Sequence, residues 1–227
     1  MSGESPLAAA ATRHDAVDTD ALDRFGFVTP RTRHDLDRFV SLLRVWQQTH
    51  NLVAPSTLEQ VWSRHVADSL QLLDHAPEFG EWVDLGSGAG FPGLVVAIAV
   101  KDRPGSHVTL VESNRKKAAF LRAAVRATGV KATVAAARIE AYAVTMAGAA
   151  DILSARALAP LAGLFPLAAP YLHGESVLLL HKGRDFVQEV EAASKSWGFD
   201  MLTIPSATDP GGTILAIRHL TPKAMRA

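Results

Sequence analysis

A glycine-rich segment between an apolar run and a helix-like segment constrains the fold more than any other feature of this chain. Gly86, Gly88 and Gly90 directly follow the short apolar run 81–85, and Pro92 stands where a helix would begin. Glycine lets the backbone turn tightly and approach a ligand where a Cβ atom would collide. Because proline suits the first turn of a helix, the segment predicts a strand, a tight loop and a helix.

The same alternation continues almost to the end of the sequence. Further strand-like runs cover 107–112, 131–137, 151–155, 175–182 and 212–219, with helical patterns between several of them. One such helix is expected over 114–128, ending at Gly129. This alternation predicts an α/β fold with a doubly wound, mostly parallel sheet that helices cover on both faces.

The first third of the chain has a different pattern. Residues 1–20 show no periodic face and are expected to form a flexible tail. Apolar residues then recur at spacings of three and four, which predicts two amphipathic helices before the sheet. They are Leu36, Phe39, Val40, Leu43 and Trp46, followed by Leu58, Val61, Trp62, Val66, Leu70 and Leu73. We therefore expect an N-terminal helical region over 21–78 that forms one compact unit with an α/β domain over 79–227.

Composition excludes several kinds of chemistry. The chain has no cysteine, so disulfides, thiolate zinc sites, iron–sulfur clusters and cysteine nucleophiles are ruled out. The nine histidines show no metal-ligand spacing, and no metal is expected. The longest aliphatic run, 94–100, is too short to span a bilayer, and the first residues lack a secretory signal. A cytoplasmic protein without a membrane partner is therefore expected.

The glycine loop favours S-adenosylmethionine over a nucleotide. The dinucleotide fingerprint requires a sixth-position glycine, where this chain has Phe91, and no Lys-Ser or Lys-Thr pair follows as in a P-loop. A loop without phosphate to bind can curve around an amino acid moiety, with Gly86 and Gly88 close to it and Asp84 available for polar contacts. Glu112 is expected at the carboxyl end of the second strand, where a carboxylate accepts hydrogen bonds from both ribose hydroxyls.

The sequence also narrows the methyl acceptor. Methylation at carbon-5 of a pyrimidine requires a cysteine, which is absent, and the Pro-Pro motif that grips exocyclic amines does not occur. No cluster of carboxylates suggests metal-assisted methylation of oxygen. An acceptor with a free lone pair, such as a purine ring nitrogen, needs only alignment with the donor and no general base.

Several motifs resemble those of the bacterial ribosomal RNA small subunit methyltransferase G family, also called glucose-inhibited division protein B. The resemblance runs from about Trp46 to Gly183 and rests on HNL (50–52), RHVADSL (64–70), VDLGSGAGFPG (83–93), VESNRKKAAFLR (111–122), ARIE (137–140), RALAPL (156–161) and HKG (181–183). It implies a class I S-adenosylmethionine-dependent methyltransferase with a Rossmann-like, mostly parallel seven-stranded sheet. The implied reaction is methylation of N7 of a guanine in a 16S rRNA loop near the decoding centre.

The resemblance also assigns site residues. The cofactor contacts of the family fall on Gly86, Phe91, Ile139, Glu140 and Arg156, with Phe91 expected to cover the cofactor and the ARIE residues to read the adenine edge. No catalytic residue is expected, because the mechanism is one of alignment. Candidate residues for positioning the substrate are Arg156 and Lys182, both predicted at the carboxyl ends of strands.

The chain departs from the family pattern at a few positions. The family usually has a serine directly before the arginine, where this chain has Ala155, and Ser154 should face the other side of the strand. The Trp-Asn and Tyr-Asn-Leu motifs of the family appear as Trp46-Gln47 and His50-Asn51-Leu52.

Some residue groups permit two interpretations. One predicted helix carries a polar cluster of Arg64, His65, Asp68 and Ser69. The cluster forms either an acid–base or RNA-facing site or, as we favour, a structural network.

Basic residues also gather in three places. The helix 114–128 should present mainly a solvated face, whereas Lys182 and Arg184 are better placed to contact phosphate. These places hold Arg31, Arg33 and Arg38; Arg115, Lys116, Lys117, Arg122 and Arg126; and Lys182 and Arg184. Core packing is favoured over base stacking for Trp46, Trp62 and Trp82.

Three functional hypotheses follow. The first is a methyltransferase whose partner is 16S rRNA or an assembly intermediate of the small ribosomal subunit, acting as a monomer. The others are a small-molecule methyltransferase and a cofactor-binding, RNA-associated module without turnover. Both alternatives accommodate the balance of 23 basic and 23 acidic side chains, which gives no general steering toward nucleic acid.

Overall fold

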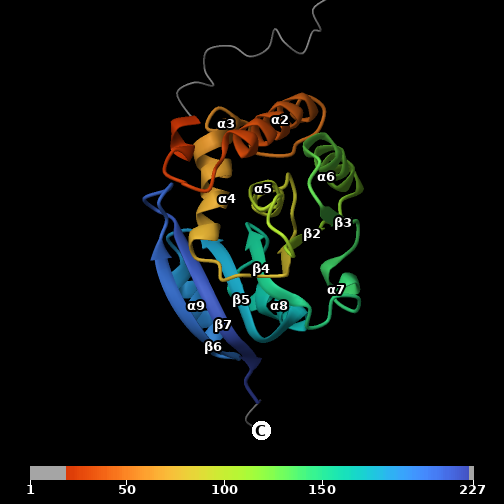
Figure 1. Cartoon of the computed structure of the whole chain (residues 1–227). Coiled ribbons are helices and arrows are strands. Elements are labelled where there is room, and N and C mark those ends of the chain that lie inside the picture. Colours follow the sequence, from red (N-terminus) through yellow and green to blue (C-terminus); the bar gives the residue numbers. More distant parts are fainter. Residues whose placement is uncertain (1–18, 225–227) are drawn as a thin grey trace, which may run out of the picture.

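The sheet has the predicted α/β architecture. The structure is a computed structural model that describes residues 19–224, and within them seven strands lie in the order β3-β2-β1-β4-β5-β7-β6 (Figure 1). All neighbouring strands are parallel except β7, which runs antiparallel to β5 and β6. The strands are β1 (Glu81–Leu85), β2 (His107–Val111), β3 (Ala132–Ala135), β4 (Ala150–Arg156), β5 (Leu172–Lys182), β6 (Trp197–Pro205) and β7 (Thr213–Pro222).

Six of these strands coincide with the apolar runs recognised in the sequence. The seventh, β6, forms the edge of the sheet, and its side chains are mostly half-buried or exposed. Its pairing with β7 is also interrupted by a register shift between Gly198 and Asp200. An edge strand of mixed polarity lacks the clear apolar pattern of a central strand, so no individual run predicted it.

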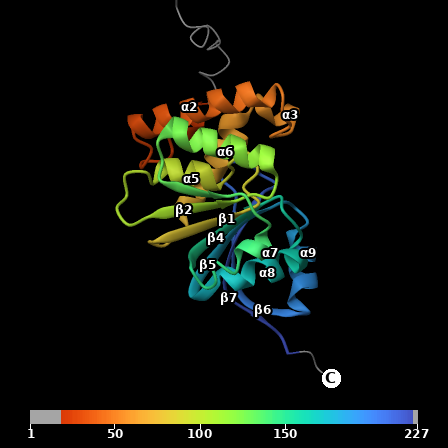
Figure 2. The same ribbon diagram turned by 90° about the vertical axis from the view of Figure 1, so that its right-hand side faces the viewer.

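Helices cover both faces of the sheet, as Figure 2 shows. One face carries α2 (Pro30–Gln47), α5 (Gly93–Ala99) and α6 (Arg115–Thr128), and the other carries α7 (Ile139–Tyr142), α8 (Leu161–Ala168) and α9 (Phe186–Ser194). Each face has its own buried apolar cluster, centred on residues such as Phe39 and Phe120 on the first and Phe165 and Tyr171 on the second. No helix within the described residues is long and apolar enough to cross a membrane.

The N-terminal helices differ in part from the expected pair. The first is α2, capped by Thr29 through a hydrogen bond from the Thr32 amide. The second is divided into α3 (Pro55–Leu58), a π-helical segment Trp62–Ala67, α4 (Asp68–Leu70) and a 3₁₀ turn Gln71–Asp74. Apolar periodicity identifies the buried face but not the switch to i→i+5 hydrogen bonds that a π-turn requires.

The predicted apolar faces of these helices pack on the sheet. Leu36 and Leu43 of α2 and Val66 of the π-helical segment belong to the same buried cluster as Phe120 of α6. Trp62 and Trp82 are almost fully buried and Trp46 packs against Phe120, so the core interpretation of the three tryptophans is confirmed. A short 3₁₀ turn begins at Thr19, and residues 1–18 of the expected tail lie outside the described residues.

The topology determines where a ligand would bind. From β1 the chain moves outward through β2 and β3, and then returns to place β4 and β5 on the other side of β1. In open α/β sheets the crevice at such a reversal, at the carboxyl ends of the strands, is the usual ligand site. Here those ends are Leu85 of β1 and Arg156 of β4, beside the glycine loop and the predicted positioning arginine.

Candidate active site

The glycine loop after β1 makes the tight turn that its glycines predicted, and the backbone is left-handed at each of them. Gly86, Gly88 and Gly90 all have positive φ, of 68°, 55° and 91°. The amides of Gly86 and Ser87 both donate to the carbonyl of Val111, which fixes the loop to the end of β2. The loop therefore lies next to Glu112, as the sequence predicted.

A hollow of about 320 Å³, which we call the glycine-loop hollow, opens at the carboxyl ends of β1 and β2. It brings together six of the eight residues predicted to bind the cofactor. These are Gly86, Gly88, Glu112, Ile139, Glu140 and Arg156. Gly86 and Gly88 leave room for an amino acid moiety, and the Glu112 carboxylate can accept hydrogen bonds from ribose hydroxyls. Ile139 and Glu140 add an apolar and an acidic side chain to the wall, so the residues present fit S-adenosylmethionine.

Glu112 is held in position by the backbone around it. Its carboxylate accepts hydrogen bonds from the amides of Gly88 (2.9 Å) and Asn114 (2.6 Å), and its side chain is mostly buried. Each carboxylate oxygen has two lone pairs, so a second acceptor position on each oxygen is left for ribose hydroxyls.

Asp84 supports the loop from beneath, which corrects its predicted availability for polar contacts with the cofactor. The side chain has no exposed area and accepts hydrogen bonds from the Ser154 hydroxyl (2.7 Å) and the Gly93 amide (3.2 Å). Burial raises the pKa of Asp84 to about 6, against the opposing effect of these hydrogen bonds. Its role in this structure is to join the start of α5 to β1 and β4.

Ser154 and Ala155, where the chain departs from the family pattern, lie on opposite faces of the sheet. The Ser154 hydroxyl accepts a hydrogen bond from the Trp82 indole and donates one to Asp84, on the side of the sheet that carries α5. Ala155 is buried in the other apolar cluster, with α8. The hydroxyl one residue earlier therefore belongs to the support of the glycine loop, not to the hollow.

Phe91 does not line the glycine-loop hollow, contrary to its expected role as a cover for the cofactor. Its ring is nearly buried and stacks on His65, with centroids 4.9 Å apart and planes inclined by 25°. The Arg156 guanidinium lies over the same ring, 5.2 Å from the centroid. Phe91 thus supports the arginine from below and joins the loop to the N-terminal helices.

Arg156 lies where three hollows meet. Besides the glycine-loop hollow it lines a rim hollow of about 550 Å³ with Lys182 and His181, and a helix hollow of about 380 Å³ with Arg64 and His65. Its guanidinium contacts the Asp68 carboxylate (3.4 Å). Burial lowers the pKa of Arg156 and the charge of Asp68 opposes that shift, so the arginine keeps its charge at neutral pH.

The next residue, Ala157, also lines all three hollows and has a positive φ of 52°. A non-glycine residue in the left-handed region costs about 1 kcal/mol, and such strain tends to gather at functional sites. This backbone turn directs the chain after Arg156 along the boundary between the hollows.

Lys182 is paired within the protein. Its ammonium donates to Glu189 (2.7 Å) and to the Ala159 carbonyl (3.1 Å), and Glu189 also accepts from the Leu161 amide. The lysine lines the rim hollow, but these contacts hold α9 and the chain after Arg156 together. In this structure Lys182 therefore positions backbone, and direct contact with phosphate would require the ion pair to open.

Asp68 is a hub that joins three distant parts of the chain. Its carboxylate accepts from Gln71 (2.7 Å), from Thr208 (2.8 Å) in the β6–β7 loop and from Arg156 at the end of β4, and its carbonyl is 2.7 Å from His181 Nε2. His65 hydrogen-bonds Thr57 instead, and Ser69 donates to the His65 carbonyl. This favours the structural interpretation of the cluster.

His65 makes the stability of the fold sensitive to acid. Burial, followed by the charge of Arg156, lowers the pKa of His65 to about 4 from 6.5. Because only the folded state disfavours the protonated ring, this stability is complete above pH 6.5 and is lost as the pH falls from 6.5 through 4. The free energy of unfolding should therefore drop by about 2 kcal/mol between pH 7 and pH 5 through this group.

Urea denaturation at the two pH values tests this effect. His65→Gln should remove most of that drop, whereas His34→Gln, at an exposed position on α2, should leave it unchanged. An equal drop in the natural chain and the His65→Gln variant would show that another group controls the acid sensitivity.

Comparisons with known proteins agree with this geometry. Residues 32–219 match the GidB family, described as rRNA small subunit methyltransferase G. The ribosomal RNA small subunit methyltransferase G of Methylorubrum extorquens strain PA1 is 48% identical over 194 residues, covering 86% of this chain and 92% of that protein. The protein of the same name from Parvibaculum lavamentivorans is 46% identical over 202 residues, covering 87% and 89%.

The fold also resembles solved structures of low sequence identity. A mutant of MtNAS in complex with S-adenosylmethionine superposes with a TM-score of 0.54 at 16% identity, covering 93% of this chain and 80% of that one. A TehB-like SAM-dependent methyltransferase from Corynebacterium glutamicum superposes with a TM-score of 0.50 at 14% identity, covering 69% of this chain and 87% of that one. These similarities show the class I methyltransferase fold. The family match over residues 32–219, with relatives that are 46–48% identical, establishes that the chain belongs to the rRNA small subunit methyltransferase G family.

Proposed function

We propose that this protein transfers a methyl group from S-adenosylmethionine to N7 of a guanine in 16S rRNA. The observation that carries the proposal is the shared wall at Arg156 and Ala157, which both the glycine-loop hollow and the rim hollow include. A donor in the first hollow and a base in the second would meet at this wall. The names of the relatives and the family match support the rRNA substrate.

The residues present account for the alignment of donor and acceptor. When bound, S-adenosylmethionine supplies an electrophilic methyl group on a sulfonium. Gly86 and Gly88 would hold its amino acid moiety and Glu112 its ribose, with Ile139 and Glu140 beside the adenine. The N7 atom of guanine carries a free lone pair, so no side chain needs to remove a proton before the methyl group moves.

Arg156 is proposed to position the substrate. The Asp68 carboxylate and the Phe91 ring hold the Arg156 guanidinium in place where the hollows meet. At that position a planar guanidinium can bind a phosphate or a base edge. We propose further that the protein acts in the cytoplasm, where 16S rRNA is made, and as a monomer, since residues of a single chain line both the glycine-loop hollow and the rim hollow.

The experiment is methyl transfer from radiolabelled S-adenosylmethionine to 16S rRNA and to small ribosomal subunits from cells that lack this gene. The expected result is about one methyl group per RNA, recovered as 7-methylguanosine. Incorporation into neither RNA nor subunits would contradict the proposal, and incorporation into a small molecule instead would favour the small-molecule alternative.

A further inference from the structure

The exposed side of α6 is unusually basic for a chain without net charge. The segment 113–139 contains seven of the 23 basic side chains and none of the 23 acidic ones. We call its exposed part the basic stripe. It consists of Arg115, Lys116, Arg122, Arg126, Lys131 and Arg138.

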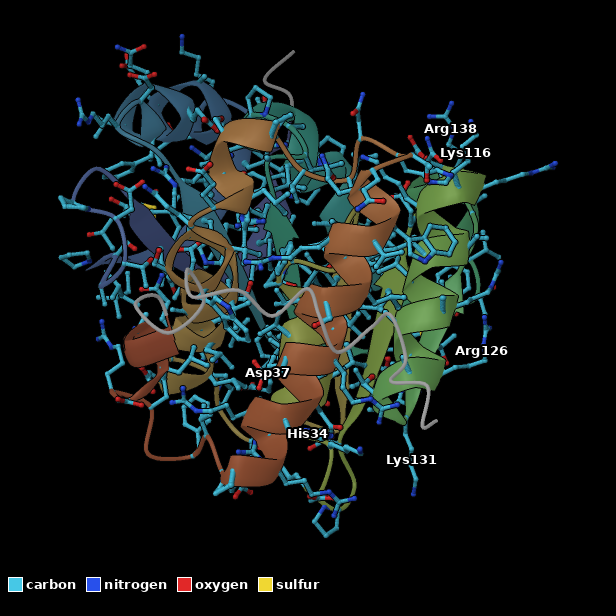
Figure 3. The ribbon with its side chains drawn as sticks, turned by 90° about the horizontal axis from the view of Figure 1, so that it is seen from above. His34, Asp37, Lys116, Arg126, Lys131 and Arg138 are labelled. Atoms are coloured by element: carbon cyan, nitrogen blue, oxygen red, sulfur yellow. The ribbon has the colours of Figure 1, made fainter. Side chains whose placement is uncertain are left out.

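The geometry of the helix aligns these charges. Arg115, Arg122 and Arg126 are separated by seven and four residues, which places them on one face of a helix. Within residues 19–224 no ion pair joins a stripe residue to an acidic side chain. Figure 3 shows Arg138, Lys116, Arg126 and Lys131 along the outer side of α6, with their side chains directed away from the ribbon.

The first turn of α6 also violates a helix rule. Arg115, Lys116 and Lys117 occupy that turn, and no acidic residue accompanies them. The amino end of a helix carries partial positive charge, so acidic side chains are stabilising there and basic ones are not. The Asn114 side chain caps the amides of Lys116 and Lys117, but it does not neutralise the basic side chains of this turn. A local arrangement of charge that opposes stability is typical of a functional surface.

The opposite face of α6 fixes the stripe relative to the candidate active site. Phe120, Leu121 and Ala124 are fully buried in the core that α6 shares with α2 and α5. At the end of the stripe, Lys117 and Arg138 line the glycine-loop hollow. The stripe is therefore a rigid extension of the wall of the candidate active site.

We propose that the basic stripe binds the sugar–phosphate backbone of the rRNA that flanks the methylated guanine. This inference rests on the proposed function and identifies where the polyanion lies outside the hollows. Exposed lysine and arginine side chains at this spacing bind phosphates without reading sequence, and they release counterions when they do. The local charge also explains how a chain with no net charge can hold RNA.

The test compares two charge reversals of equal size. The stripe variant is Arg122→Glu with Arg126→Glu, and the matched control is Lys195→Glu with Arg218→Glu, at exposed positions after α9 and on β7. Binding of 16S rRNA, purified free of ribosomal proteins, is measured by filter retention at several salt concentrations. Binding of S-adenosylmethionine is measured in parallel.

The stripe variant should bind this rRNA about tenfold more weakly at low salt, and the slope of log affinity against log salt should shrink by about 1.5 for two lost phosphate contacts. The control should remain within about twofold of the natural chain, and S-adenosylmethionine affinity should not change. Equal slopes for the two variants would overturn the proposal. Weaker binding to whole subunits with unchanged binding to naked rRNA would also overturn it and indicate an acidic ribosomal protein.

A second variant separates this function from a structural role. Arg115→Glu with Lys116→Glu should keep or slightly raise the Tm, because acidic residues suit the first turn, while rRNA binding falls. Unchanged rRNA binding in this variant would contradict the stripe. If the natural chain binds rRNA through the stripe but transfers no methyl group, the proposed function fails and the stripe stands; if it methylates rRNA and the slopes are equal, only the stripe fails.

Discussion

Gly86→Asp is expected to weaken the binding of S-adenosylmethionine at least about a hundredfold and to abolish methyl transfer. Gly86 has a φ of 68°, lines the glycine-loop hollow, and a Cβ atom there would lie 2.8 Å from Leu158 Cδ1. The substitution would place a carboxylate beside Glu112 and Glu140 in a site expected to hold the carboxylate of the cofactor. A hundredfold loss corresponds to about 2.7 kcal/mol of binding free energy.

The matched control is Gly105→Asp. Gly105 also has a positive φ, of 80°, but nothing lies within 4 Å of its added Cβ and it is remote from the hollow. Both variants carry similar backbone strain, so isothermal titration calorimetry of the two separates strain from loss of the site. Tight cofactor binding by Gly86→Asp would show that the loop does not cradle the cofactor.

Asp68→Ala is expected to lower the free energy of unfolding by about 3–5 kcal/mol. It would leave the mostly buried guanidinium of Arg156 without its carboxylate and remove the acceptor for Gln71 and Thr208. It would also remove one of the contacts between the β6–β7 loop and the N-terminal helices, where Gln71 still hydrogen-bonds Ser206 and the Ala207 amide. Chemical denaturation followed by circular dichroism measures the loss.

An exposed ion pair at a similar distance provides the control. Asp102 and Arg31 are 3.5 Å apart and both are about two-thirds exposed, so Asp102→Ala should cost no more than about 1 kcal/mol. If Asp68→Ala were as mild as Asp102→Ala, Asp68 would not be a hub. In a double-mutant cycle, Arg156→Met should cost less in the Asp68→Ala background than alone, because the partner charge is already gone.

Local sequence signals predicted the framework of the site. The glycines at 86, 88 and 90 indicated a tight loop, and the structure has one, with positive φ at all three. The helix α6 begins and ends as its sequence indicated. Asn114 caps its first turn, and Gly129 ends it in the left-handed conformation with a φ of 64°. These features depend on neighbours within a few residues, which is why a single sequence reveals them.

The side-chain partners could not be predicted in the same way. Asp84 accepts a hydrogen bond from Ser154, 70 residues later in the chain. Because of this contact Asp84 supports the glycine loop, whereas the sequence suggested that it would contact the cofactor. Asp68 meets Thr208 across 140 residues, and the pairing leaves no local pattern in the sequence. Lys182 lies at the end of its strand, as predicted, but its ion pair with Glu189 depends on how α9 packs against the rest of the fold. Each of these roles is decided by tertiary packing, which periodicity and motif spacing do not contain.

The measurement that tests the central claim most directly is nucleoside mass spectrometry of small-subunit rRNA from cells with and without this gene. Mapping by fragment analysis should show one 7-methylguanosine that is lost with the gene, restored by the natural chain and by Gly105→Asp, and not restored by Gly86→Asp. Unchanged 7-methylguanosine in cells that lack the gene would contradict the proposed reaction and show that guanine N7 of this rRNA is not the methyl acceptor.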